Sequence, residues 1–131
     1  MKLLLDTHAL IWFMNDSPRL PRSLVRQFLD VSVTLCISRI SLLEIAIKSQ
    51  LAKDDFPLIF DHWLQRFQLF DFEVLEITDA HLVALSQLPL VKDHRDPFDR
   101  LLIAQALTEN LTLISRDGKF GEYAGLKLQW V

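Results

Sequence analysis

Short apolar runs alternate along this chain with segments of helical spacing, and that alternation constrains the fold more than any other feature of the sequence. Three of the runs, Lys2 to Leu5, Val33 to Ile37 and Leu111 to Ile114, are short enough to be strands. They are also apolar throughout most of their length, as parallel strands buried on both faces are. Phe72 to Ile77 is a further strand candidate. A pattern near the end of the chain, with apolar side chains at every second position, predicts a half-buried edge strand at Leu126, Leu128 and Trp130.

Between these runs, apolar residues recur every three or four positions, which predicts amphipathic helices. The recurring positions are Leu24, Val25, Phe28 and Leu29; Ile40, Leu43, Ile47 and Leu51; Ile59, Trp63 and Phe67; and Leu82, Leu85 and Leu88. Strands that alternate with helices place the chain in the α/β class, and we expect a three-layer α/β/α sandwich around a mainly parallel central sheet. With 131 residues and no repeat or linker, the chain is expected to form a single domain over residues 1–131.

Composition narrows the setting in which the protein works. Cys36 is the sole cysteine, which excludes a disulfide within the chain and favours a reducing, cytoplasmic location. No apolar run approaches the roughly 18 residues that a membrane span needs, so we expect a soluble protein that does not contact a membrane. The mean hydropathy of +0.22 is high for a short soluble chain. It indicates apolar surface that a partner covers.

Two acidic residues follow apolar runs at the positions where a parallel sheet places its ligands. The binding crevice of an open parallel sheet lies beyond the carboxyl ends of its strands. Asp6 directly follows Leu3 to Leu5, and Asp117 comes three residues after Ile114. If both strands are central and parallel, their two carboxylates face the same crevice.

Three further acids each allow two interpretations. Ser41 and Glu44 match a capping box, in which Ser41 is the N-cap and Glu44 reaches back from the third helical position. Asp96, as N-cap before Pro97, and Asp99 likewise match a helix start. The helix after Asp99 is, however, apolar on nearly all sides, so Asp99 should point into a protein-lined space where an unpaired charge is costly. We therefore expect a cationic group to meet Asp99.

If these acids converge at one end of the sheet, their charges need compensation. Two carboxylates about 4 Å apart repel by about 4 kcal/mol at an effective dielectric constant of about 20. A hard divalent cation relieves this repulsion. Because no set of histidines or cysteines with ligand spacing accompanies the acids, oxygen ligands favour Mg²⁺ or Mn²⁺ over zinc. Magnesium commonly takes further ligands from substrate phosphates, so the set points to phosphoryl chemistry.

The charge distribution agrees with a polyanionic substrate. Setting the five acids aside raises the formal charge of the chain from −3 to +2. Four basic residues flank the acids in sequence, as expected if a nucleic acid approaches the site, although each could also be a solvated surface charge. They are Arg95, Arg100, Arg116 and Lys119.

The ordered set of motifs resembles the PIN-domain family, and within it the VapC-type toxins of type II toxin/antitoxin pairs. The resemblance runs from end to end of the chain. It is carried by Leu3 to His8, by Ser38 to Glu44, by Asp93 to Ala106 and by Leu113 to Asp117. It implies a PIN-like nuclease domain with the α/β/α fold described above.

The resemblance also implies the residues of the site. An acidic quartet in this family binds one or two Mg²⁺ or Mn²⁺ ions, and its counterparts here are Asp6, Glu44, Asp99 and Asp117. Asp96 could be an additional ligand, a water-mediated contact or only a helix cap. Thr7 and Ser115 match small hydroxyl residues that hydrogen-bond the carboxylates, and Ser115 stands where the family usually has threonine.

The activity implied is that of a metal-dependent endoribonuclease, in which a metal-activated water attacks phosphorus and leaves 3′-hydroxyl and 5′-phosphate ends. The partners implied are an RNA substrate, a second copy of the chain in a homodimer, and a cognate antitoxin. An amphipathic helix and a basic residue of the antitoxin would enter the acidic cleft. The successive large residues Trp12, Phe13 and Met14 support an interface, because three such side chains in a row are not expected to face one core.

Three other classes of protein share part of this pattern, and one non-catalytic alternative remains. Asp6-Thr7-His8 also opens the site of calcineurin-like metallophosphoesterases, but His62, His81 and His94 stand isolated in the sequence and do not complete that site. A haloacid-dehalogenase-type phosphatase needs an acid where His8 stands. A receiver domain needs an acid at the end of its third strand, whereas Thr78-Asp79 looks like a helix cap. The remaining alternative is a non-catalytic PIN-like module that binds RNA or protein, and it would bind RNA without cutting it.

Overall fold

The computed structural model describes residues 1–130 and contains a five-stranded sheet with the order β3-β2-β1-β4-β5. The strands are β1 (Lys2–Leu5), β2 (Thr34–Ser38), β3 (Glu73–Leu75), β4 (Thr112–Ile114) and β5 (Lys127–Gln129). All four pairings are parallel. The central position of β1, between β2 and β4, confirms the expectation that Asp6 and Asp117 follow neighbouring parallel strands.

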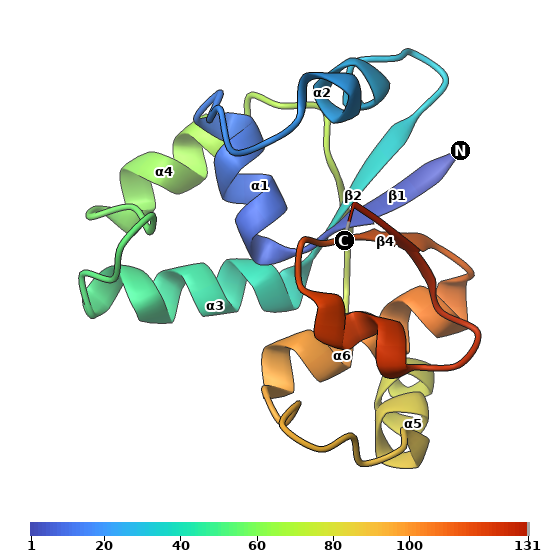
Figure 1. Cartoon of the computed structure of the whole chain (residues 1–131). Helices are drawn as coiled ribbons and strands as arrows, with labels where there is room; N and C mark the ends of the chain where they lie inside the picture. The colour runs from blue at the N-terminus through green and yellow to red at the C-terminus, as the bar shows by residue number, and fades with distance from the viewer. Residues whose placement is uncertain (131) are drawn as a thin grey trace.

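Helices cover both faces of the sheet, which confirms the three-layer α/β/α architecture (Figure 1). The helices are α1 (Thr7–Met14), α2 (Arg22–Phe28), α3 (Arg39–Gln50), α4 (Phe60–Phe67), α5 (Asp79–Gln87) and α6 (Pro97–Glu109), with a 3₁₀ turn η1 (Gly118–Glu122) before β5. In Figure 1, α1, α2 and α4 lie on one side of the sheet, and α5 and α6 lie on the other. The sheet is thereby enclosed between two helical layers.

Alternation along the strands builds two separate hydrophobic cores. Leu3 and Leu5 of β1 pack with α1, α2 and α4, whereas Leu4 between them packs with α6. β2 repeats the pattern, because Leu35 and Ile37 join the first core while Cys36 joins the second. Successive side chains of a strand point to opposite faces, so a continuous apolar run supplies both layers. Burial of each such leucine contributes about 1.5–3 kcal/mol relative to its exposure.

The region around α1 differs from expectation. Trp12 and Met14 are buried, and Phe13 is half-buried against the rings of Phe28, Phe70 and Phe72. The alternative that one of them lies in an interface stays a prediction, but none of these three side chains is exposed, so the expectation of an exposed one is wrong. The reason is that α1 packs against several elements, so that apolar side chains can leave it in different directions and still be buried.

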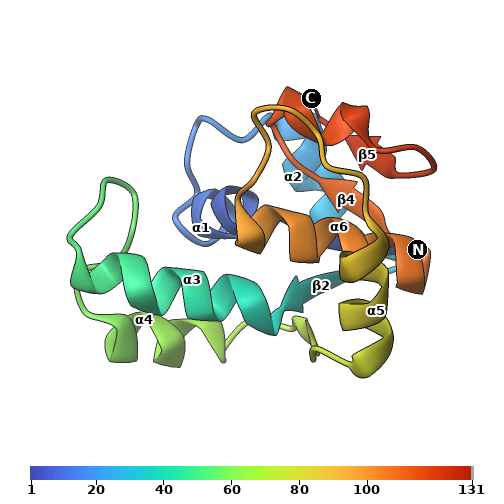
Figure 2. The same ribbon diagram turned by 90° about the horizontal axis from the view of Figure 1, so that it is seen from below.

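Helix α3 extends away from the sheet (Figure 1). Seen from below in Figure 2, it runs beside α4 and beneath α6, and it also contacts α1. The beginnings of α1 and α6 and the middle of α3 thus come together beyond the carboxyl ends of β1 and β4. This is the crevice that an open parallel sheet is expected to form.

Candidate metal centre

A small cavity of about 160 Å³ lies at this crevice, and five carboxylates line it. Its acidic residues come from four separate segments of the chain: Asp6, Glu44, Asp96, Asp99 and Asp117. Thr7, His8, Lys48 and Phe120 complete the lining. The structure therefore brings together all the acids that the sequence singled out.

Asp6 occupies the junction between β1 and α1. Its backbone N–H donates to Ile114 O of the neighbouring strand at 3.0 Å. Its side chain caps α1, because Oδ1 accepts from Ala9 N at 2.8 Å. Burial raises the pKa of Asp6, and the nearby charge of Glu44 acts in the same direction.

Glu44 does not form the capping box that its spacing with Ser41 suggested. Helix α3 begins at Arg39, and its N-cap is Ser38, whose hydroxyl accepts from Ile40 N. Glu44 therefore lies in the second turn of the helix, where it is buried and faces the cavity. The Thr7 hydroxyl donates to Glu44 Oε1 at 2.6 Å, and the Lys48 ammonium pairs with Oε2.

Asp96 and Asp99 have different roles at the start of α6. Asp96 is the N-cap, and its Oδ1 accepts from Phe98 N and Asp99 N, with Pro97 in the first turn. This confirms the predicted helix start. Asp99 lies one turn further on and is 26% exposed. Burial, reinforced by the charges of Asp96, Glu44, Asp6 and Asp117, raises the pKa of Asp99 to about 7.

The expected cation at Asp99 is not a lysine or an arginine. Within residues 1–130, the ion-pair contact of Asp99 is with His94, whose Nε2 lies 3.4 Å from Oδ2. Burial lowers the pKa of His94, so the neutral imidazole dominates at neutral pH. The negative charge of the cavity is therefore met in the protein mainly by Lys48, which pairs with Glu44 rather than with Asp99.

Asp117 and Ser115 form a turn after β4. Asp117 caps the 3₁₀ turn η1, because its Oδ1 accepts from Lys119 N at 2.9 Å. Ser115 is fully buried, and its hydroxyl accepts from Asp117 N at 3.0 Å. This bond holds the chain so that Asp117 returns to the cavity that Asp6 enters from the neighbouring strand.

His94 is the residue that sequence reasoning missed. Ligand atoms of His94, Asp99 and Asp117 all lie within 4.8 Å of one another. The sequence holds no set of histidines with ligand spacing, and His94 is a single histidine that the fold brings to the acids. It stands in a loop without periodicity, and Asp93 before it adopts a left-handed φ of 64° that turns the chain. The one signal in the sequence was its position two residues before the N-cap Asp96.

The family of the protein is decided by its match to known domains. The PIN domain matches residues 3–126, which is nearly the whole chain. The chain belongs to the PIN-domain family. No curated protein matches its sequence.

Solved structures agree with this PIN-domain fold. A DNA-bound VapBC from Salmonella typhimurium has a TM-score of 0.72 and 21% identity, with 100% of this chain and 99% of that chain covered. VapBC2 from Rickettsia felis, bound to a DNA fragment from its promoter, has a TM-score of 0.71, 19% identity and 98% of both chains covered. FitAcB from Neisseria gonorrhoeae has a TM-score of 0.64 and 20% identity, with coverage of 98% and 96%. At these identities the likeness establishes the shared fold.

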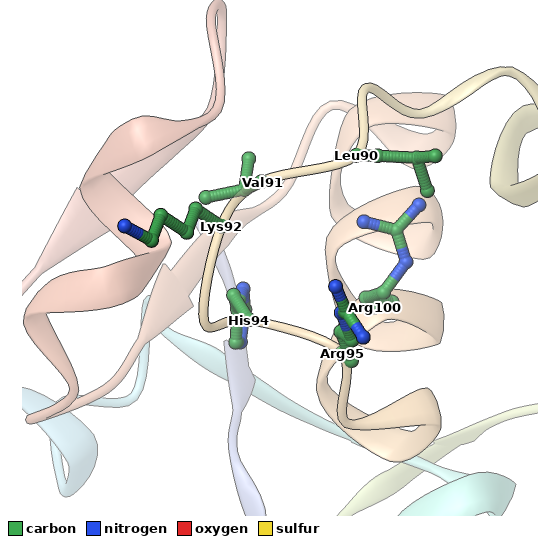
Figure 3. A pocket seen from close by; sticks show the side chains of 6 residues that line it. All are labelled: Leu90, Val91, Lys92, His94, Arg95 and Arg100. Carbon is green, nitrogen blue, oxygen red and sulfur yellow. The ribbon is translucent and has the colours of Figure 1, made fainter.

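The basic residues near the acids of this PIN domain differ in their availability. Arg100 points inward, where its guanidinium donates to Pro89 O, Leu88 O and the Tyr123 hydroxyl. The Arg116 guanidinium lies 5.9 Å from the centre of the Trp12 ring, and Lys119 lies in the turn after Asp117. Arg95 lines a second cavity of about 390 Å³, shown in Figure 3 with His94 and Arg100. Among the described residues, Arg100 is the one of these four whose side chain already donates hydrogen bonds to protein groups.

The part of this PIN domain that the structure describes, residues 1–130, includes no helix with both the length and the apolar character needed to span a bilayer.

Proposed function

We propose that this PIN domain is a divalent-metal-dependent endoribonuclease and the toxin of a toxin/antitoxin pair. The observation that carries the proposal is the convergence of Asp6, Glu44, Asp99 and Asp117, from four separate segments, on one small cavity. If these acids only capped helices or lay solvated at the surface, we would not expect them to share one cavity. Burial, reinforced by the charges of the neighbouring acids, raises the pKa of Asp99 to about 7, a cost that a bound cation would remove.

The donor set fits Mg²⁺ or Mn²⁺. Carboxylate oxygens are the ligands that these hard cations prefer, and one or two ions would be held by Asp6, Glu44, Asp99 and Asp117. Asp96 is the exposed member of the five lining acids, so we assign it a water-mediated contact rather than a direct one. When bound, the cation lowers the pKa of an attacking water and stabilises the leaving oxygen of a phosphodiester.

The size of the cavity identifies which part of the substrate enters it. A volume of about 160 Å³ holds a cation with a few waters or a phosphate, since each water occupies about 30 Å³ in the liquid, but it is too small for a nucleotide as well. We therefore propose that the RNA lies across the mouth with its backbone toward the acids. Arg95, Arg116 and Lys119 lie within two residues in sequence of Asp96 or Asp117, and we propose that they attract the phosphates.

The protein's own polar groups hold the acids in place. Thr7 donates to Glu44, and Ser115 shapes the turn that carries Asp117. Lys48 lies within the lining and partly offsets the charge of Glu44 before a cation binds. In this proposal Thr7 supports a carboxylate directly, whereas Ser115 supports Asp117 through its backbone N–H.

A second proposed element is an antitoxin that covers α3. Similar solved structures include a toxin-antitoxin complex from Klebsiella pneumoniae and a member of the VapBC family of toxin-antitoxin systems from Mycobacterium tuberculosis. On this chain, four-residue intervals separate three exposed apolar residues, Leu43 and Ile47 on α3 and Leu51 at its C-cap. Leu43 and Ile47 are next in sequence to Glu44 and Lys48, which line the cavity. An amphipathic antitoxin helix could cover this apolar stripe while a basic side chain enters the acidic cavity. We also propose a homodimer and a cytoplasmic location.

The nuclease proposal is tested by incubating the purified chain with RNA and Mn²⁺, with and without EDTA. Cleavage is expected with Mn²⁺, and it should be abolished both by EDTA and by Asp6→Asn. Asp61→Asn, at an exposed acid on α4 away from the cavity, is the matched control and should leave cleavage unchanged. Cleavage that persists in EDTA would contradict the metal mechanism, and RNA binding without cleavage would favour a non-catalytic module.

The toxin proposal is tested by expression in a bacterium. The chain is expected to arrest growth, Asp6→Asn should not, and co-expression of the small protein encoded next to it should restore growth. Sedimentation of the purified chain at micromolar concentration should show a dimer. Arrest by the Asp6→Asn variant would show that the toxicity does not come from the acidic cavity.

A further inference from the structure

A series of hydrogen bonds connects Arg100, through Tyr123 and His94, to Asp99 at the cavity. Arg100 Nη1 donates to the Tyr123 hydroxyl at 3.1 Å, that hydroxyl lies 2.9 Å from His94 Nδ1, and His94 Nε2 lies 3.4 Å from Asp99 Oδ2. His94 and Tyr123 are 3% and 4% exposed. The stretch from His94 to Arg100 therefore meets Tyr123, at the end of η1, through the buried side chains of His94 and Tyr123.

The donors and acceptors in this series fix which group donates in each hydrogen bond. Arginine only donates, so the oxygen of Tyr123 accepts from it. The hydroxyl proton of Tyr123 then has His94 Nδ1 as its acceptor among the described residues. A neutral imidazole that accepts at Nδ1 carries its proton on Nε2. That proton points at Asp99 Oδ2.

The contact occupies one oxygen of Asp99 and leaves the other for the cavity. Asp99 lines the cavity, yet within residues 1–130 the contact with His94 is the side-chain hydrogen bond of this carboxylate. Without it, the side chain of Asp99 could rotate freely at the edge of α6. Carboxylates that bind metals in proteins are themselves usually held by hydrogen bonds from a second layer of residues.

We propose that Arg100, Tyr123 and His94 are positioning residues that orient Asp99 so that its free oxygen faces a divalent cation in the cavity. This inference rests on the proposed metal-dependent function. It assigns Arg100 a role inside the protein in place of the RNA contact that its sequence position suggested. In this role His94 is buried beside the acids and holds one of them without binding the cation itself.

Figure 3 shows the loop that carries His94 and Arg95, with Arg100 on the neighbouring α6. The Arg100 guanidinium also donates to Pro89 O at 2.9 Å, which fixes the beginning of the loop. The Tyr123 ring packs edge-on against the His94 ring, with centroids 5.4 Å apart. Removal of the Tyr123 hydroxyl alone would therefore break the hydrogen-bonded chain while it leaves this packing in place.

The test measures Mn²⁺ affinity of the purified full chain by titration, together with the unfolding temperature of the metal-free protein. Tyr123→Phe and His94→Phe are expected to weaken Mn²⁺ binding about ten- to hundredfold. His94→Gln should recover part of the loss, because its amide N–H can donate to Asp99 as Nε2 does. If His94→Phe fails to fold, Tyr123→Phe decides the question, since it removes a single oxygen atom.

His81→Phe is the matched control. His81 is also a buried histidine paired with a carboxylate of α6, Glu109, but it lies at the other end of that helix and does not line the cavity. Its replacement should lower the unfolding temperature and leave Mn²⁺ affinity unchanged. A loss of affinity in this control as large as that of Tyr123→Phe would show that the effect is general destabilisation, and would overturn the proposal.

Two further outcomes separate this inference from the function on which it rests. Electron paramagnetic resonance of bound Mn²⁺ should show no coupling to a histidine nitrogen, and a coupling that disappears in His94→Gln would make His94 a ligand rather than a positioning residue. Wild-type protein that binds Mn²⁺ and cleaves RNA, with Tyr123→Phe and His94→Phe of equal affinity, would refute the positioning role alone. Wild-type protein that binds no Mn²⁺ would refute both proposals.

Discussion

Helix α6 pairs a histidine with a carboxylate near each of its ends, and the two pairs lie in different surroundings. At the beginning, His94 contacts Asp99, which is 26% exposed and shares its cavity with four other acids. At the end, His81 contacts Glu109, which is 42% exposed and lies outside that cavity. The pairing is chemically alike at both ends. Asp99 has a raised pKa because it is buried among like charges, and the neutral histidine beside it does not offset that cost.

The comparison also separates two uses of a buried histidine. His81 Nδ1 accepts from Thr78 N and completes the capping box of α5, so its role is to begin a helix and hold it to α6. His94 caps no helix, and its two ring nitrogens connect Tyr123 to Asp99. The histidine at the start of α6 therefore serves the cavity, whereas the one at the end serves the fold.

The largest expected effect comes from neutralising the carboxylate at each end of α6. Asp99→Asn should lower RNA cleavage with Mn²⁺ by roughly a hundredfold or more, because it removes a proposed metal ligand rather than a group behind one. Glu109→Gln should leave cleavage within about twofold of wild type. Initial rates at saturating Mn²⁺ measure both. Equal losses in the two variants would erase the distinction between the ends of the helix.

A second effect follows from the raised pKa of Asp99. A proton and a cation compete for this carboxylate, whose pKa is about 7 in the metal-free protein. Mn²⁺ affinity should therefore rise about tenfold per pH unit up to about pH 7 and then level off. Calorimetric titration between pH 5.5 and 8.5, in buffers of different ionisation enthalpy, should also show proton release below pH 7. Constant affinity across this range would contradict the predicted charge crowding.

Lys48 tests how charge in the cavity affects metal binding, because its ammonium lies among the cavity acids and pairs with Glu44. Lys48→Met removes a positive charge that repels an incoming cation, so Mn²⁺ should bind about tenfold more tightly. Lys53→Met, at an exposed lysine outside the cavity lining, is the matched control and should leave affinity unchanged. Weaker binding in Lys48→Met would mean that Lys48 organises the acids instead of competing with the metal.

The smallest effect is on stability without metal. The folded-state pKa of Asp99 lies above its unfolded value of 3.8, so the folded protein binds more protons between about pH 4 and 7 and loses stability as pH rises through this window. Asp99→Asn abolishes this loss. Its unfolding temperature in EDTA should exceed that of wild type by roughly 5 °C at pH 8, with the difference shrinking toward pH 5. Glu109→Gln should show no such gain.

Much of the fold was predictable because its signals are local. Apolar runs of strand length, helical spacing between them, and the N-cap at Asp96 were each apparent in the sequence, and each corresponds to an element of the structure. Strand β3 is shorter than the predicted run from Phe72 to Ile77, as an edge strand with a single neighbour would be. The predicted spacing of Ser41 and Glu44 was misleading, because the same two residue types fit a capping box and a buried site.

The sequence by itself determined an α/β chain with acids at the ends of its parallel strands, since a strand of apolar residues needs burial on both faces and its carboxyl end is where such a sheet opens. Three features depend on contacts that form only on folding. His94 turns inward to Asp99, and Arg100 is held by Tyr123 and backbone carbonyls. Trp12 and Met14 are buried, and Phe13 is half-buried. The physical reason is distance along the chain. Periodicity and capping act within a few residues, whereas the direction of a loop side chain and the burial around a charge depend on segments tens of residues away.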